Sequence, residues 1–149
     1  MSLSEELRAL YQEVILDHYK SPRNFGTLEA ADQCADGYNP LCGDQFKVCL
    51  KMEDDRVAEA AFEGSGCAIS TASASLMTEA VKGLRREQAE ALFEDFHQLI
   101  AGAEPPDKDL GKLEVLAGVR DYPVRIKCAT LAWHAMKSAL AAGETVSTE

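Results

Sequence analysis

No apolar stretch in this chain of 149 residues approaches the ~20 residues that a membrane-spanning helix needs. The N-terminus has no basic region followed by an apolar stretch, which argues against a secretory signal. Positive charge is also scarce, because 15 Lys and Arg face 25 Asp and Glu and leave a net charge of −10. A basic face for nucleic acid is therefore not expected. These absences predict one cytoplasmic domain over residues 1–149, with no membrane or nucleic-acid partner.

Short catalytic and metal motifs are missing as well. The sequence contains no CxxC pair and no HExxH segment. None of its three histidines flanks a cysteine beside glycine, which argues against an enzyme with a Cys–His nucleophile. His18 and His134 are expected to be core or surface residues of long helices, and His97 a surface residue. Five cysteines in a reducing compartment are not expected to form structural disulfides.

Three of the cysteines lie in segments that differ from the rest of the chain. Cys42 and Cys67 have glycine neighbours, which predict exposed turns, and Cys128 lies near the start of a predicted helix. Thiolates are soft metal ligands, and Asp44 adds a carboxylate two residues after Cys42. We therefore expect these four side chains to share one tetrahedral metal ion. Structural zinc sites usually take only Cys and His, so the carboxylate indicates a reactive centre with an exchangeable ligand.

The remaining cysteines and the charges around Cys128 give weaker evidence of function. Cys34 and Cys49 lack such flanks and are expected to be small buried hydrophobes. Basic residues surround Cys128, namely Arg120, Arg125 and Lys127. They would favour a thiolate if they face the sulfur, or form a surface cluster without chemical meaning. The sequence leaves both interpretations open.

Hydrophobic periodicity predicts an α+β fold, a small antiparallel three-stranded sheet with helices packed on one face. Apolar spacing of three to four residues predicts an N-terminal helix that ends at Ser21–Gly26. Alternation predicts a hairpin of strands 45–52 and 57–63, with a third strand near 31–38. Helices are expected over 69–82, 86–100, 110–116 and from Pro123 to about Ala142. One face of the last helix should point inward; it contains Val124, Cys128, Leu131, Ala132, Ala135 and Ala139.

Several long segments of the chain carry a family resemblance. They are Tyr11–Tyr19, Ser21–Asn24, Asn39–Asp44, Gly66–Ser73 and Cys128–Trp133. In these segments the sequence resembles the IscU/SufU family of iron–sulfur cluster assembly proteins, nearly end to end.

Three features resemble the SufU branch of that family. Lys127 stands where IscU has a histidine. Asp121–Arg125 replaces the Leu-Pro-Pro-Val-Lys motif that an Hsp70 chaperone reads in IscU. The stretch from Arg85 to Leu110 also looks like an insertion.

The resemblance implies a zinc-dependent sulfur-transfer protein of iron–sulfur cluster biogenesis. Zinc would be bound by Cys42, Asp44, Cys67 and Cys128. A SufS-type cysteine desulfurase, which uses pyridoxal phosphate, would supply the sulfur, and a histidine of that enzyme would replace Cys42 on zinc. Cys42 would then accept the persulfide, with Arg125 in a supporting role, and pass the sulfur to a downstream Suf scaffold. The chain would activate the desulfurase rather than act as a stand-alone enzyme.

Two other functions fit the same residues. The first is a scaffold that assembles a [2Fe–2S] cluster, because thiolates bind iron–sulfur clusters as well as zinc. The second is a zinc-stabilised interaction module without transfer chemistry. Ligand type alone does not separate them.

Overall fold

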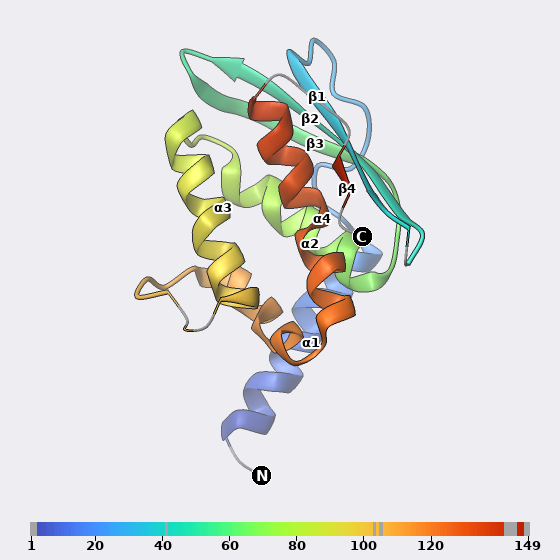
Figure 1. Ribbon diagram of the computed structural model, residues 1–149, viewed down its shortest axis with the longest axis vertical. Helices are drawn as coiled ribbons and strands as arrows, with labels where there is room; N and C mark the ends of the chain where they lie inside the picture. Colours follow the sequence, from blue (N-terminus) through green and yellow to red (C-terminus); the bar gives the residue numbers. More distant parts are fainter. Residues whose placement is uncertain (1–2, 41, 103, 105, 142–145, 148–149) are drawn as a thin grey trace.

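The computed structural model describes residues 3–40, 42–102, 104, 106–141 and 146–147 (Figure 1). Helices and a small sheet follow one another along the chain as α1 (Leu3–Lys20), β1 (Gln33–Asn39), β2 (Asp44–Glu53), β3 (Arg56–Ser65), α2 (Ala68–Val81), α3 (Arg86–Ala101), the 3₁₀ helix η1 (Gly111–Asp121), α4 (Pro123–Leu140) and β4 (Val146–Ser147). None of the helices in this described part of the chain is both long and apolar enough to cross a membrane.

The sheet has the strand order β3-β2-β1-β4. β1, β2 and β3 are antiparallel, which confirms the predicted three-stranded sheet. Asp54 and Asp55 connect β2 to β3 with φ values of 51° and 60°, as the favoured two-residue hairpin turn requires. Two-residue β4 pairs parallel with β1 and was not predicted, because so short a strand has no periodicity of its own. The β1–β2 register sets Asn39 opposite Asp44, and this end of the ladder positions the site described below.

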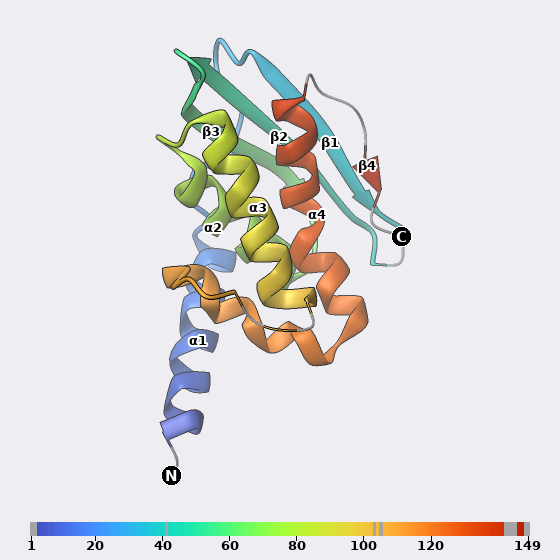
Figure 2. The same ribbon diagram turned by 60° about the vertical axis from the view of Figure 1, so that its left-hand side comes forward.

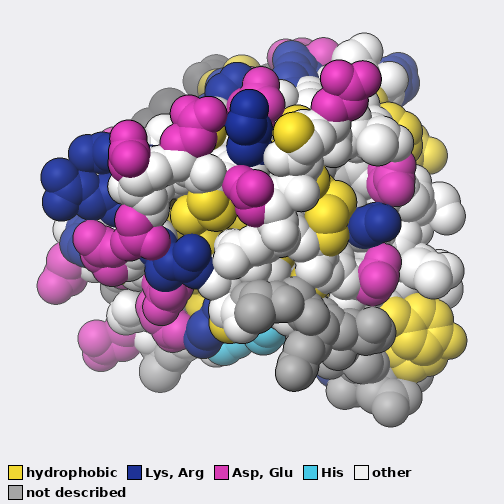
Figure 3. All heavy atoms as spheres, turned by 90° about the horizontal axis from the view of Figure 1, so that it is seen from above, with side chains coloured by type: hydrophobic (Ala, Val, Ile, Leu, Met, Phe, Trp, Pro, Cys, Tyr) yellow, Lys and Arg dark blue, Asp and Glu magenta, His cyan; other side chains and the backbone are white. Residues whose placement is uncertain are grey.

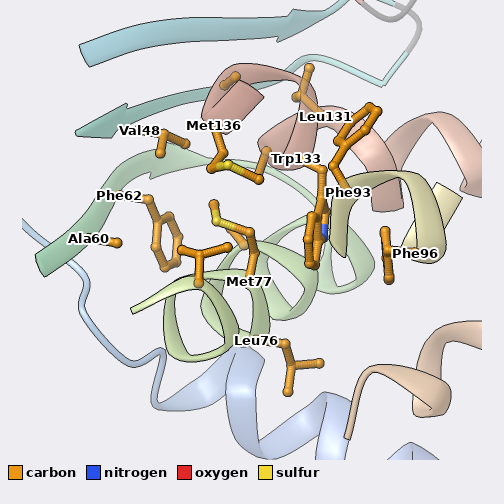
Figure 4. Close-up of a cluster of buried hydrophobic side chains, with 14 of the residues drawn as sticks. Val48, Ala60, Phe62, Leu76, Met77, Phe93, Phe96, Leu131, Trp133 and Met136 are labelled. Atoms are coloured by element: carbon orange, nitrogen blue, oxygen red, sulfur yellow. The ribbon is translucent and has the colours of Figure 1, made fainter. Parts of the chain in front are cut away.

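Helices α2, α3 and α4 lie on one side of the sheet, while the N-terminal part of α1 projects away from it (Figures 1 and 2). The core fills the space between sheet and helices with large apolar side chains (Figure 4). Trp133 of α4 is fully buried and stacks on Phe96 of α3, with ring centroids 4.3 Å apart. Trp133 is therefore a packing residue of the core. Burial of each such side chain contributes roughly 1.5–3 kcal/mol.

Two helical predictions need correction. Val124 is 51% exposed, although Cys128 and Leu131 on the same face of α4 are buried. Residues 121–125 are all exposed, so the first turn of this helix extends beyond the layer of side chains packed against the sheet. The short helix expected at 110–116 is instead a 3₁₀ helix that continues to Asp121. Four of its residues are buried, Val115 among them, and the other three recur every three positions, at Leu113, Leu116 and Val119, which matches three residues per turn.

The prediction that no cysteines form a structural disulfide is wrong. Cys34 of β1 lies directly opposite Cys49 of β2, their Cα atoms are 4.1 Å apart, and the two are joined by a disulfide. Both are partly buried and bonded to each other, so the prediction that they are small buried hydrophobes is wrong as well. Directly opposed residues in an antiparallel pair point to the same face at this separation. Strand register is a tertiary property, and the local sequence does not contain it.

The histidines lie in the environments expected for them, and the surface charges are mixed. His18 is buried, with its Nδ1 atom 2.7 Å from the Ser75 hydroxyl oxygen. His97 is exposed, as expected, and His134 packs edge-on against Phe93. On the face seen in Figure 3, Lys and Arg side chains are interspersed with Asp and Glu. That face therefore presents no continuous basic surface.

Candidate metal centre

Three of the four predicted ligands meet at one end of the β1–β2 ladder. One ligand atom each of Cys42, Asp44 and Cys128 lies within 4.8 Å of the other two. The sulfur atoms of Cys42 and Cys128 are 3.5 Å apart. Two thiolates on one tetrahedral zinc, with Zn–S bonds of about 2.3 Å, lie about 3.8 Å apart. The group is thus close to the size that a single metal ion requires.

The turn between β1 and β2 presents Cys42 to solvent. The Gly43 N–H donates to the Asn39 carbonyl oxygen at 2.9 Å, which closes the turn. Gly43 has a φ of +72°, a conformation in which glycine has no steric penalty. Cys42 is consequently exposed, whereas Asp44 begins β2 and is fully buried. The exposed thiol predicted at this glycine turn is confirmed.

Asp44 is the strongest indication of a cation. Its Oδ1 atom accepts the Cys67 backbone N–H at 2.9 Å, but its Oδ2 atom is buried without a hydrogen-bond partner among the described residues. A carboxylate oxygen removed from water without compensation is costly, and a bound cation would remove that cost. Gly66 lets the chain approach this carboxylate closely, because a Cβ there would lie 2.7 Å from Oδ1. The donor set of sulfur and carboxylate fits zinc or a related soft ion.

Cys67 lies beside this group, outside the set of three. It is the N-cap of α2, and its sulfur accepts the Ser70 backbone N–H at 3.4 Å. Its thiol is half-buried and is not one of the three ligand atoms within 4.8 Å of each other. This sulfur therefore lies at the N-terminus of α2. The structure thus brings three predicted ligands together and leaves the fourth next to them, at the helix start predicted for it.

Cys128 is fully buried in the second turn of α4. Burial first, and then the neighbouring Cys42 thiol and Asp44 carboxyl, raise the pKa of the Cys128 thiol well above its usual range. The basic residues nearby therefore do not hold it as a thiolate. Arg120 instead donates to the backbone carbonyls of Leu99 and Gly102. Between the two open interpretations, the surface cluster is favoured.

The basic residue that the sequence singled out, Arg125, lies in the exposed first turn of α4, three residues before Cys128. Asn39, which was not among the predicted site residues, also reaches the site. Its side-chain Nδ2 donates to the Cys128 sulfur at 3.9 Å in a buried environment. Locally Asn39 reads only as a turn residue before Pro40, since its partner is 89 positions away in the chain. No local signal could have identified it.

Comparison with known proteins identifies the family of this chain. Residues 10–129 match the model of the NifU-like N terminal domain. The chain belongs to this family. It is 46% identical over 145 residues to the zinc-dependent sulfurtransferase SufU of Bacillus subtilis, which covers 97% of this chain and 98% of that protein. It is 45% identical over 141 residues to the iron–sulfur cluster assembly scaffold protein IscU of Streptococcus pyogenes, covering 94% and 87% of the two chains.

Solved structures show the same fold in this NifU-like family. An iron–sulfur cluster assembly scaffold protein for the SUF system, from Fervidobacterium islandicum, superposes with a TM-score of 0.82 at 32% identity. The match covers 89% of this chain and 98% of that one. A NifU-like N-terminal protein from Brucella abortus gives a TM-score of 0.79 at 26% identity, covering 88% and 92%. The resemblance to the IscU/SufU family and the predicted α+β class are both confirmed.

Proposed function

We propose that this chain is a zinc-dependent sulfur-transfer protein of iron–sulfur cluster biogenesis. One observation carries the proposal: an exposed cysteine shares a metal-sized group with a buried cysteine and a buried carboxylate. A purely structural zinc site would have no need of an accessible ligand. The relationship to a protein named as a zinc-dependent sulfurtransferase supports the same function.

The metal would be held by Cys42, Asp44, Cys67 and Cys128. Bound zinc would keep these sulfurs deprotonated at neutral pH and protect them from oxidation. The chain itself contributes the difference in access, because Cys42 faces solvent whereas Asp44 and Cys128 are closed off from it. The Cys67 backbone N–H orients the carboxylate at the centre of the group.

Cys42 would accept the sulfur. Its thiolate attacks the outer sulfur of a persulfide on the partner enzyme's cysteine, and a new S–S bond forms on Cys42. The S–S bond of the partner breaks, and its electron pair leaves with the partner's cysteine as a thiolate. Charge and sulfur are conserved, so no oxidant or reductant is required. The product is a persulfide on an exposed turn, where a second protein can reach it.

The partners follow from this chemistry. The donor would be a SufS-type cysteine desulfurase that uses pyridoxal phosphate, and the acceptor a downstream Suf scaffold. Arg125, exposed at the start of α4, would support docking or orient the incoming persulfide. A cytoplasmic place of action belongs to the same proposal. There the Cys34–Cys49 disulfide would face a reducing environment.

The proposal is tested by replacing the accepting thiol. Zinc-loaded Cys42→Ser should fail to stimulate cysteine desulfuration and should carry no persulfide after a single turnover. The doubly substituted Cys34→Ser/Cys49→Ser protein is the matched control, since it loses two sulfurs outside the site and should stimulate fully. Undiminished stimulation by Cys42→Ser would exclude the role assigned to this residue.

A cluster scaffold is the second candidate function. The 45% identity to a protein named as an IscU scaffold favours it, and the same sulfur ligands suit iron. Metal analysis of protein purified without oxygen separates the two. One colourless zinc per chain supports sulfur transfer, whereas brown protein containing iron and sulfide, able to convert an apo-ferredoxin, supports the scaffold.

A further inference from the structure

The three thiols of the site differ in their hydrogen bonds. The Cys67 sulfur accepts the Ser70 backbone N–H, and the Cys128 sulfur accepts the side-chain amide of Asn39. The Cys42 sulfur contacts the Cys128 thiol but has no N–H donor among the described residues. Only one of these N–H donors belongs to a side chain, so only Asn39 can be changed without altering the backbone.

Asn39 also joins the segments that carry the ligands. Its carbonyl oxygen accepts the Gly43 N–H and closes the turn that presents Cys42. Its Cα lies opposite that of Asp44 at the last rung of the β1–β2 ladder. Its side chain, fully buried, reaches across to α4 and Cys128. One residue thus fixes the turn, the carboxylate and the helix relative to one another.

We propose that Asn39 is a positioning residue that decides which thiolate leaves the metal, an inference that rests on the function proposed above. Its amide holds the Cys128 sulfur in place, so the exposed Cys42 sulfur is the one released. If Cys128 swung out, the buried amide would lose its sulfur partner; Cys42 loses no such bond. Donors in the outer shell of a metal site commonly change metal affinity or ligand reactivity by 10- to 100-fold, roughly.

Electronic structure gives this proposal a signature separate from activity. An N–H donor withdraws charge from a thiolate sulfur and lowers its lone-pair energy, which raises the energy of sulfur-to-metal charge transfer. In cobalt-loaded protein, Asn39→Ala should therefore shift the near-ultraviolet charge-transfer band to longer wavelength. Asn39→Asp keeps the size of the side chain but loses the N–H donor, and should shift the band in the same direction. It provides the measurement if the alanine variant does not fold.

The second readout is the order in which the zinc-loaded sulfurs react with iodoacetamide, mapped by mass spectrometry. In the native protein, Cys42 should be modified first. In either Asn39 variant, the rate at Cys128 relative to Cys42 should rise by about tenfold, the effect expected for loss of one donor to a charged sulfur. Ser73→Ala is the matched control, because that buried hydroxyl bonds the Ala129 carbonyl and Trp133 next to the site without touching a sulfur.

Variants that lower only the stability of the metal-free fold, with band position and alkylation order unchanged, would overturn the proposal. So would a Ser73→Ala protein that shows the same changes. Neither readout uses a desulfurase. The two proposals can therefore fail separately. If Cys42→Ser still stimulates desulfuration fully while the alkylation order is the predicted one, the proposed function is rejected and the role of Asn39 stands.

Discussion

The two ends of the β1–β2 ladder both carry cysteines, and they use them in opposite ways. At one end Cys34 and Cys49 face each other across the strands and are bonded. At the other end, past Asn39 and Asp44, Cys42 and Cys128 stay free although their sulfurs are 3.5 Å apart.

The difference is in what surrounds the sulfurs. At the disulfide end the two cysteines are directly opposed, which is the geometry that a covalent bond needs. The free end adds a buried carboxylate, one oxygen of which has no hydrogen-bond partner in the part of the chain that the structure describes, and N–H donors to two of the three sulfurs. Proximity alone therefore does not decide whether two cysteines form a disulfide or bind a metal. A buried carboxylate beside the pair is what makes it a candidate metal site.

The sharpest test removes that anion. Asp44→Ala should lower zinc affinity by about 150-fold, because structural zinc binding of about 10–16 kcal/mol is shared among four ligands and each carries about 3 kcal/mol. Competition with a chromophoric chelator measures the loss. Asp36→Ala, an exposed acidic residue of the same sheet, is the control and should bind zinc normally. Equal affinities in the two variants would remove Asp44 from the ligand set.

The disulfide end should matter for stability and not for metal. Breaking the Cys34–Cys49 bond, by reduction or by double substitution with Ser, should lower the free energy of unfolding by about 3 kcal/mol for a separation of 15 residues. Urea denaturation of the oxidised and reduced forms gives this value. Zinc affinity of the double Ser variant should stay within about twofold of the native protein. A large fall in affinity would show that the two ends are coupled.

The free end should respond to pH. Because burial and its neighbours raise the pKa of the Cys128 thiol, this group is protonated in the metal-free protein at neutral pH. Zinc must displace that proton, so affinity should rise about tenfold per pH unit for each proton released. Calorimetry in buffers of different ionisation enthalpy counts the protons. A pH-independent affinity would contradict a protonated Cys128.

The smallest expected effect is on stability at low pH, and it separates unfolding by acid from release of zinc by acid. Burial lowers the pKa of His18 in the folded protein, with a further contribution from Arg23 and an opposing one from Glu79. The unfolded chain then binds the proton more strongly, so stability present above about pH 6.5 is lost as the pH falls toward the folded pKa.

His18→Gln should flatten that part of the stability curve, measured by denaturation of metal-free protein between pH 5 and pH 7.5, roughly. It should leave the pH dependence of zinc affinity unchanged. His134, whose pKa is also lowered chiefly by burial, accounts for a residual slope. His97→Gln, at an exposed position, is the matched control. A slope unaffected by His18→Gln would show that this histidine does not govern acid stability.

Much of the fold could be predicted because its signals are local. Alternation located β2 and β3, and the segment with proline and glycine at 21–26 marked where α1 ends. The predictions of an inward-facing Val124 and of a short helix at 110–116 were wrong for a different reason. Exposure and helix type depend on how far the packed layer of the core extends over a segment. The predicted ligands Cys42, Asp44 and Cys128 do converge, while the sulfur of Cys67 turns to the N-terminus of α2.

The sequence by itself determined β1, β2 and β3, most of the helices and which side chains carry chemistry. Glycine turns, apolar spacing and residue type are properties of neighbouring residues, and they act within a few positions. Only the tertiary structure decided that Cys34 meets Cys49 and that Asn39 reaches Cys128. Both contacts depend on strand register and on the packing of α4 against the sheet, which are set by side chains distributed over the whole chain.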